Sequence, residues 1–397
     1  MRRLDLKKAH AARGNTIRDF NRQIVLNYVR EREGISRAEI ARETKLQRST
    51  VSAIVEDLKS EGLIEEIAKG ESTGGRRPQM LKLRAAGAIA MGVAITPTFT
   101  TVASSDLAGR LIDQEEFVTD PDLDKTLSRV IDCVREFSQR NSASIDGVGL
   151  CLPGLVDPAS GKLYYVPYFQ WRDIPVSQLI SNAVGLPVVI DNDANSVALA
   201  ELWFGRPEVS NARDFIMVMV AEGVGTGIIF DGQVYRGQGG AAGEFGHMVI
   251  GTKAPVPCSC GNSDCWEAFS SERAAINRYL TFAGLPLTTT IRFREVVDRA
   301  LGGERSATLA LVETARYLGI GISNLIVGFS PEAVVVGGEL ARAWNLIESS
   351  LTETIEHSVR RGLPPVRILA STLGEKPTLR GALSLVLANR FAAAFAA

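Results

Sequence analysis

The sequence is poor in cysteine and histidine and has no long hydrophobic run. It contains 5 cysteines and 3 histidines in 397 residues. Three of the cysteines fall close together, which does not suit the disulfide framework of a secreted protein and in a reducing cytosol more often indicates a metal site. No apolar run approaches the roughly 18–20 residues of a membrane span, and the first residues lack the apolar core of a signal peptide. We therefore expect a cytoplasmic protein with no membrane partner.

Charge is distributed unevenly along a chain that is long enough for two or three domains. The net charge at pH 7 is −1, but residues 1–82 carry +6 and the remainder carries −7. With 45% hydrophobic and 22% charged residues, the composition is that of a globular protein. A basic first segment on an acidic body suits an amino-terminal domain that binds a polyanion, although a merely solvated basic surface would give the same balance.

The first 61 residues show the periodicity of three helices. The first is expected over residues 16–32, and its apolar residues share one face: Ile17, Phe20, Ile24 and Tyr28. Ser36-Arg37-Ala38-Glu39 has the form of a capping box, which predicts a short second helix that ends near residue 44. A third helix is expected from about residue 48 to residue 61, and its start is uncertain by a residue or two because Gln47 is a poor cap.

The third predicted helix has the pattern of a DNA-recognition helix. Its buried face follows the i, i+3, i+4, i+7 spacing: Val51, Ile54, Val55 and Leu58. Its amino-terminal end carries side chains that could reach bases or phosphates: Arg48, Ser49, Thr50 and Ser52. The Gly74-Gly75-Arg76-Arg77-Pro78 hairpin that follows suits a wing whose two arginines enter the minor groove. Although any three-helix unit shows such periodicity, the combination predicts a winged helix-turn-helix in residues 1–85 that binds double-stranded DNA.

From residue 86 onward, apolar strands alternate with helices, which predicts an α/β domain in residues 86–397. The expected strands cover residues 88–95, 147–152, 187–190, 215–220, 226–230, 333–336 and 366–370. A long helix rich in small residues is expected over residues 308–327. The sequence contains no repeat of about 20–50 residues.

The clustered cysteines predict a structural metal site. Cys258, Cys260 and Cys265 lie in one tight loop, and His247 precedes Cys258 by eleven residues. Three thiolates and one imidazole form a common four-coordinate zinc site and leave no position for a substrate, so the expected zinc ion is structural. Three free buried thiols are the alternative, which the proximity of the cysteines disfavours.

Polar side chains gather where a predicted strand ends. Asp191-Asn192-Asp193-Ala194-Asn195 follows the strand at 187–190 and opens a helix. Such groups at the carboxyl end of a strand face the crevice in which open α/β sheets bind ligands. Gly243-Glu244-Phe245-Gly246-His247 and Glu267 add polar groups near the cysteine loop. The set suits the vicinal hydroxyls of a sugar, whereas an Asn-Asp pair alone is usually only a helix cap.

Taken together, these segments resemble the ROK family of sugar-dependent repressors and sugar kinases. The resemblance rests on Leu152-Pro153-Gly154-Leu155-Val156-Asp157, on residues 191–195 and 243–247, and on the cysteine signature of residues 258–267. In that signature Asp264 replaces a usual glycine. The likeness covers nearly the whole chain and includes the winged amino terminus of the repressor branch.

The resemblance implies an actin-like ATPase fold with two lobes and a sugar bound between them. The lobes would comprise approximately residues 86–200 plus the carboxyl-terminal helix, and approximately residues 201–380. By position, five residues would contact the sugar: Asn192, Asp193, Glu244, His247 and Glu267. His247 would use one imidazole nitrogen for the sugar and the other for zinc. Asp193 matches the catalytic base of the family's kinases.

The first phosphate loop of the kinases is degenerate in this chain. ROK kinases carry Asp-x-Gly-Gly-Thr on the first strand of the domain, whereas here the stretch reads Gly92-Val93-Ala94-Ile95-Thr96-Pro97-Thr98. Ala94 stands where the aspartate is expected, and Pro97 has no amide donor. Residues 223–227 and Gly337-Gly338 keep their glycines, but glycines also serve tight turns. Because phosphoryl transfer needs a phosphate cradle and an acidic group for magnesium, we expect no enzyme activity.

The sequence thus predicts a transcription repressor of carbohydrate genes that a sugar inducer releases from operator DNA. A homodimer or homotetramer is expected, because helix-turn-helix proteins usually bind paired half-sites. One alternative is a sugar kinase with an attached DNA-binding domain. Another is a repressor that has lost sugar binding and responds to a protein partner or a phosphorylated metabolite. Repression is favoured over activation only by the resemblance.

Overall fold

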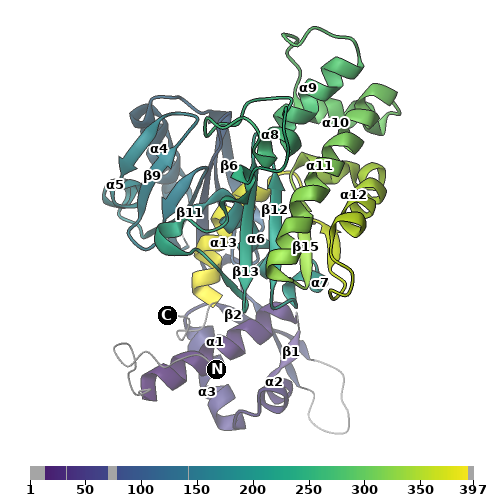
Figure 1. The fold of residues 1–397 in the computed structure, drawn as a ribbon. Coiled ribbons are helices and arrows are strands. Elements are labelled where there is room, and N and C mark those ends of the chain that lie inside the picture. Colours follow the sequence, from purple (N-terminus) through teal and green to yellow (C-terminus); the bar gives the residue numbers. More distant parts are fainter. Residues whose placement is uncertain (1–13, 33, 70–77, 142, 392–397) are drawn as a thin grey trace.

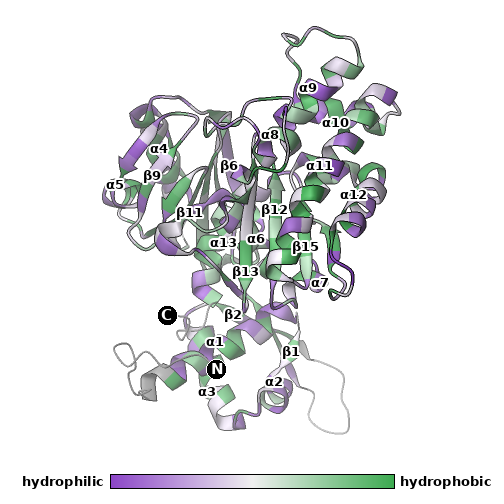
Figure 2. Ribbon diagram, viewed as in Figure 1, coloured by the Kyte–Doolittle hydropathy of each residue, from purple (hydrophilic) through white to green (hydrophobic). Residues whose placement is uncertain are grey.

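A computed structural model describes residues 14–32, 34–69, 78–141 and 143–391 (Figure 1). A small amino-terminal domain lies at one end of a larger body that contains two five-stranded sheets. The helices α6 (Asp193–Phe204) and α13 (Pro377–Phe391) run between the two sheets. The hydrophobic residues concentrate in the interior strands, and the outer helices alternate between hydrophobic and hydrophilic positions (Figure 2).

The amino-terminal domain is a helix-turn-helix with a flanking hairpin. Its helices are α1 (Gly14–Glu31), α2 (Arg37–Thr44) and α3 (Arg48–Ser60), and its strands pair in the order β1 (Ile35–Ser36), β3 (Gln79–Leu83) and β2 (Ile64–Lys69). The predicted capping box is present, because Ser36 accepts from the amide of Glu39 and the Glu39 carboxylate accepts from the amide of Ser36. The α3 residues predicted to be buried, Val51, Ile54, Val55 and Leu58, all lie in the core.

The face of α1 that packs differs from the apolar face chosen on the sequence. Val25, Leu26 and Val29 are buried, whereas Ile17 is 51% exposed and Phe20 is 37% exposed. In the carboxyl-terminal half of α1, the buried residues therefore follow the expected ones by one position: Val25 follows Ile24, and Val29 follows Tyr28. The reason is tertiary: that half of α1 packs between the domain's own sheet and the end of α13.

The first lobe contains the sheet with strand order β11-β7-β4-β5-β6. Its strands are β4 (Ile89–Ile95), β5 (Phe99–Asp106), β6 (Leu111–Val118), β7 (Ile145–Leu152) and β11 (Val188–Asn192). β4, β7 and β11 are parallel. β5 pairs with β4 antiparallel, and β6 pairs with β5 antiparallel, so that only β5 runs against the direction of the other four strands. The helices α4 (Leu123–Arg140) and α5 (Val176–Val184) pack on one face. A small sheet of β8 (Leu155–Asp157), β9 (Lys162–Val166) and β10 (Trp171–Ile174) covers the end of the lobe.

The second lobe contains the sheet with strand order β14-β13-β12-β15-β16. Its strands are β12 (Phe215–Val220), β13 (Val224–Phe230), β14 (Gln233–Val234), β15 (Ala333–Gly337) and β16 (Arg367–Ala370). Its helices are α7 (Pro207–Ser210), α8 (Trp266–Ser270), α9 (Glu272–Phe282), α10 (Phe293–Leu301), α11 (Arg305–Phe329) and α12 (Trp344–Ser358). Within the described residues, α11 is long and apolar enough to cross a membrane, but most of its apolar window is buried in this lobe, as in a core helix.

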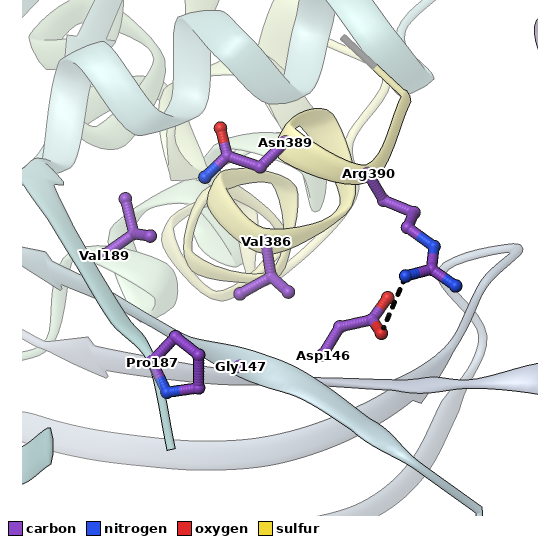
Figure 3. A pocket seen from close by; sticks show the side chains of 7 residues that line it. All are labelled: Asp146, Gly147, Pro187, Val189, Val386, Asn389 and Arg390. Atoms are coloured by element: carbon purple, nitrogen blue, oxygen red, sulfur yellow. Dashed lines mark ion pairs between the residues drawn. The ribbon is translucent and has the colours of Figure 1, made fainter. Parts of the chain in front are cut away.

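The helix α13 joins the first lobe to the amino-terminal domain and packs against α6. It packs directly on β4 and β7, where a Cβ at Gly149 would meet the carbonyl oxygen of Ala382 at 1.9 Å. Its last turn lies against α1, because Nδ2 of Asn27 donates to the carbonyl oxygen of Phe391 over 2.8 Å. On its other side, Arg390 pairs with Asp146 across a cavity of about 230 Å³ at the edge of β7 and β11 (Figure 3).

Candidate ligand site, metal centre and DNA-facing helix

The amino-terminal end of α3 is accessible, as a recognition helix requires. Arg48 and Ser49 are exposed, and Thr50 and Ser52 are partly exposed on the same end of the helix. α2 ends with Lys45 in the left-handed conformation, and Gln47 caps α3 without a side-chain hydrogen bond. The predicted wing residues Arg76 and Arg77 lie outside the described residues, between β2 and β3.

Four predicted ligands converge beside the cleft between the lobes. His247 lies in a short 3₁₀ helix (Glu244–His247), and Cys258, Cys260 and Cys265 lie in the loop before α8. Their ligand atoms all lie within 4.8 Å of one another. Nδ1 of His247 is 3.3 Å from Sγ of Cys258, and Sγ of Cys260 is 3.7 Å from Sγ of Cys265. The group could hold a metal ion.

These distances suit a tetrahedral ion. With metal–sulfur bonds of about 2.3 Å, two thiolates on a tetrahedron lie about 3.8 Å apart, close to the observed 3.2 and 3.7 Å separations of the sulfur atoms. Burial and a hydrogen bond to Glu267 raise the pKa of the Cys258 thiol. The convergence of three sulfur atoms and one imidazole gives a donor set that fits a soft divalent ion.

The five residues predicted to contact a sugar all line one cavity between the lobes. The cavity has a volume of about 100 Å³ and is bordered by Asn192, Asp193, Glu244, His247 and Glu267. The first two come from the junction of β11 and α6, and the other three come from the second lobe. The structure thus brings together side chains that are up to 75 positions apart in the chain.

Asn192 fixes the amino terminus of α6 at the floor of this cavity. Its Oδ1 accepts from the amides of Ala194 and Asn195, and its Nδ2 donates to the carbonyl oxygen of Gly154 over 3.0 Å. Asp193 follows as the first helical residue. Burial, followed by the nearby Glu222 and Glu244, raises the pKa of Asp193 to about 7. A carboxyl group poised near neutrality can accept a hydrogen bond from a hydroxyl group or donate one to it.

The metal loop and the cavity share side chains. His247 directs Nδ1 toward the cysteines, and its Nε2 lies 3.5 Å from Oε2 of Glu244. Oε1 of Glu267 accepts from the amide and hydroxyl of Ser259, between two of the cysteines, over 3.1 and 2.9 Å. A metal ion bound to the loop would therefore fix the orientation of two residues that face the cavity.

Sequence reasoning did not single out Tyr168 as a residue of the cavity. Tyr168, from the loop between β9 and β10, lines it, and burial together with Glu267 and Glu222 raises the pKa of its hydroxyl. A Cβ at Gly223 would lie 2.6 Å from Oε2 of Glu267 and 3.4 Å from the Tyr168 hydroxyl, so the two lobes approach closely at this glycine. The sequence contained only an aromatic-rich loop at this place, which has no distinctive spacing.

Carboxylates crowd the region beside the two loops that the sequence analysis compared with the phosphate loops of kinases, at residues 92–98 and 223–227. Glu222 follows β12, and its Oε1 is 3.3 Å from Oγ1 of Thr98 in the first of these loops. Burial and the charges of Glu222 and Glu339 raise the pKa of Glu272 to about 8. Ala94 is 3% exposed within β4 and offers no side-chain ligand.

Comparisons with known proteins agree with this architecture. Residues 90–389 match the model of the ROK family, and residues 24–77 match that of the MarR family. The chain is 31% identical over 376 residues to the xylose repressor of Bacillus spizizenii, covering 94% of this chain and 96% of that protein. The match to this relative extends over both the winged domain and the body.

Solved structures give the same result. A ROK family transcriptional regulator, described as a homologue of the Escherichia coli MLC protein, superposes with a TM-score of 0.79 and 25% identity over 95% of this chain and 97% of its own. A ROK family glucokinase from Streptomyces griseus, with glucose and AMPPNP bound, superposes with a TM-score of 0.67 and 28% identity over 75% of this chain and 98% of its own. The predicted fold, an actin-like two-lobed α/β body preceded by a winged helix-turn-helix, is confirmed, and the chain belongs to the ROK family.

Proposed function

We propose that the protein is a DNA-binding repressor of carbohydrate genes and that a sugar bound between the lobes relieves repression. The observation that carries the proposal is the combination, in one chain, of an accessible α3 amino terminus and a polar interlobe cavity. The matched relative, which aligns over nearly its whole length, is named a xylose repressor. The division into a DNA-binding domain at residues 1–85 and a sugar-binding domain at residues 86–397 is part of this proposal.

The sugar contacts proposed are Asn192, Asp193, Glu244, His247 and Glu267. Together they offer amide, carboxyl and imidazole groups within one small cavity, which suits several adjacent hydroxyl groups. Arg48, Ser49, Thr50 and Ser52 are proposed to contact DNA from α3, and Arg76 and Arg77 from the wing. A sugar that favours one arrangement of the lobes would shift the spacing of two winged domains in a homodimer or homotetramer, and so weaken operator binding.

The proposed metal is a structural zinc ion held by His247, Cys258, Cys260 and Cys265. When bound, it would supply charge to stabilise three thiolates and would fix the loop that carries Ser259 and precedes Glu267. Four protein ligands complete a tetrahedron, so no ligand position is left for a reaction.

Kinase activity is not part of the proposed function. Glu222 and Glu339 lie close enough to Glu272 to raise its pKa, and the negative charge of this group would oppose the phosphates of a nucleoside triphosphate bound beside it. The retained glycines have a packing role: a Cβ at Gly227 would lie 2.4 Å from the carbonyl oxygen of Ala194, and one at Gly338 would lie 1.9 Å from that of Val220. Their survival therefore does not require a nucleotide.

The test is fluorescence anisotropy with DNA from upstream of the protein's own gene, titrated with D-xylose, D-glucose and N-acetyl-D-glucosamine. We expect tight binding that one sugar weakens by about 100-fold, a coupling free energy of roughly 2.7 kcal/mol. Asp193→Ala should bind the DNA and resist release. Release of Asp193→Ala at the wild-type sugar concentration would contradict the placement of the site, and transfer of phosphate from ATP to any of these sugars would contradict the non-enzymatic assignment.

A further inference from the structure

Arg236 crosses from the second lobe to the first. It follows β14, and both its Nε and its Nη2 lie 2.7 Å from Oδ2 of Asp191 in β11. Asp191 is only 1% exposed. Burial raises the pKa of the Asp191 carboxyl, and Arg236 opposes that effect. The two residues therefore form an ion pair between the lobes in which the carboxylate is buried and the guanidinium is partly exposed, with two donors of one guanidinium on one carboxylate oxygen.

Asp191 in turn holds the strand–helix junction at the floor of the cavity. Its Oδ1 accepts from the amide of Asn192 over 2.8 Å and from Nδ2 of Asn195 over 3.3 Å. Both of its oxygens are thus engaged, one by the second lobe and one by the first turn of α6. Any displacement of the Arg236 guanidinium would be transmitted through Asp191 to Asn192 and Asn195, which flank Asp193.

The backbone of Arg236 holds the other half of the cavity. Its carbonyl oxygen accepts from the amide of Ala242 over 3.0 Å, and the carbonyl oxygen of Gly243 accepts from Oγ1 of Thr226. Between these points the chain reaches the first lobe, where a Cβ at Gly240 would meet the carbonyl oxygen of Val156 at 1.9 Å. The loop of residues 236–243 therefore extends onto the first lobe and returns to deliver Glu244.

We propose that Arg236 is the positioning residue that keeps the two halves of the sugar site in register. One half consists of Asn192 and Asp193, which the side chain of Arg236 holds through Asp191. The other half is Glu244, which the backbone of Arg236 holds through the loop of residues 236–243. This inference rests on the proposed sugar-binding function. Because hydrogen bonds weaken steeply when donor and acceptor move by a few tenths of an ångström, both halves must be held at once for a sugar to use them together.

The same sheet provides a matched control. Arg213, just before β12, makes a similar ion pair with Asp231 in the turn between β13 and β14, over 2.7 Å. The side chains of that pair are 71% and 33% exposed, and neither is among the residues that line the cavity. Replacing Arg213 by lysine changes the same chemistry in the same sheet without touching either half of the site.

The experiment measures sugar affinity, DNA affinity without sugar, and thermal stability in the full chain. Arg236→Lys keeps the charge but loses the planar fork, so it cannot bond twice to Asp191. We expect its Kd for D-xylose, measured by isothermal titration, to rise at least tenfold, with DNA affinity unchanged within twofold and a Tm close to wild type. Arg213→Lys should match the wild type in all three. If D-xylose does not bind the wild type, the same titrations use N-acetyl-D-glucosamine and D-glucose.

A second variant separates loss of the ion pair from destabilisation by an unpaired buried charge. Asp191→Asn combined with Arg236→Gln removes both charges together and leaves no buried charge unpaired; it too should bind DNA and lose sugar affinity. Sugar affinity equal to wild type in Arg236→Lys or in the double variant would overturn the inference. So would losses of DNA affinity and Tm in proportion to the loss of sugar affinity, because they would indicate general destabilisation. A wild-type protein that binds DNA but none of the sugars overturns the proposed function and this inference with it.

Discussion

The guanidinium of Arg30 in α1 lies 4.6 Å from the ring centroid of Trp203 at the carboxyl end of α6. Nη1 of Arg30 also donates to the Trp203 carbonyl oxygen over 3.3 Å, and the Phe391 ring lies 5.1 Å away. Burial lowers the pKa of Arg30. Since α6 begins at Asp193, one helix extends from the floor of the cavity to the contact with the DNA-binding domain.

This contact predicts that Trp203→Ala weakens the coupling between sugar and DNA while sparing both binding events. The variant removes the aromatic platform on which Arg30 rests, so the winged domain should follow α6 less closely. We expect the factor by which sugar lowers DNA affinity to fall at least fivefold, roughly 1 kcal/mol of coupling. Anisotropy titrations with and without sugar measure it. Unchanged coupling with intact folding would show that the domains communicate elsewhere.

Asp193 predicts a specific pH dependence of stability. Its pKa is raised from 3.8 to about 7, so the folded protein holds a proton that the unfolded chain releases between these values. Stability from this group is present at low pH and is lost as pH rises through that window. Asp193→Asn cannot ionise and should be more stable than wild type at pH 8, by on the order of 1–3 kcal/mol, but not at pH 4. Urea denaturation at the two pH values measures the difference, and equal differences at both would count against a raised pKa.

The metal centre predicts that Cys260→Ser loses zinc and stability together. Three remaining ligands hold zinc more weakly, and the loop that carries Ser259 loses its anchor. Zinc content per chain and Tm should both fall, and a chelator should lower the wild-type Tm in the same way. Cys133→Ser, in α4, is the control and should retain a full zinc content. A Cys260→Ser protein with one zinc per chain would refute the ligand set.

The predicted wing is tested by the salt dependence of DNA binding. Replacing Arg76 and Arg77 with alanine should weaken operator binding and reduce the slope of log K against log salt by about 2, because each phosphate contact contributes about 0.9. The exposed pair Arg360 and Arg361 in the body provides a control with the same charge change. An unchanged slope in the wing variant would mean that these arginines do not contact DNA.

Two glycines of α11 predict opposite effects of the same substitution. A Cβ at Gly321 would lie 2.0 Å from the Trp266 ring, whereas one at Gly328 would meet nothing within 4 Å. Gly321→Ala should therefore destabilise the protein by about 1–3 kcal/mol through overpacking. Gly328→Ala should stabilise it by up to about 1 kcal/mol through helix propensity. Chemical denaturation measures both, and a neutral Gly321→Ala would mean that Trp266 moves aside at little cost.

Local patterns allowed the prediction of the parts of the fold that are close in sequence. The capping box at Ser36, the buried face of α3 and the seven apolar strands needed only a few neighbouring residues each. By contrast, β5 and β6 were not predicted. β5 contains Thr100, Thr101, Ser104 and Ser105, which are buried although polar because they face neighbouring strands and helices of the lobe. β6 is an edge strand with mostly exposed side chains.

In the candidate site, too, only the features that depend on residues close in sequence could be predicted. The cysteine loop, and the position of His247 relative to it, were accessible because metal-ligand spacing is a short-range signal. Tyr168 and Arg236 could not be predicted in this way, because their roles depend on how the two lobes approach each other. The pattern of residues within one segment carries no information about that approach. The exposed stripe on α1 was misjudged for a related reason: the surface that covers this helix comes from the far end of the chain.

That long-range contact determines the order in which a growing chain can complete its structure. Asn27 and Phe391 are 364 positions apart, yet they are hydrogen-bonded neighbours. During synthesis the helix-turn-helix emerges before both lobes, and α13 emerges after them. A nascent chain therefore exposes α3 well before α13 can cover β4 and β7 of the first lobe. Folding of the complete molecule depends on a late, high-contact-order docking step, which is intrinsically slow.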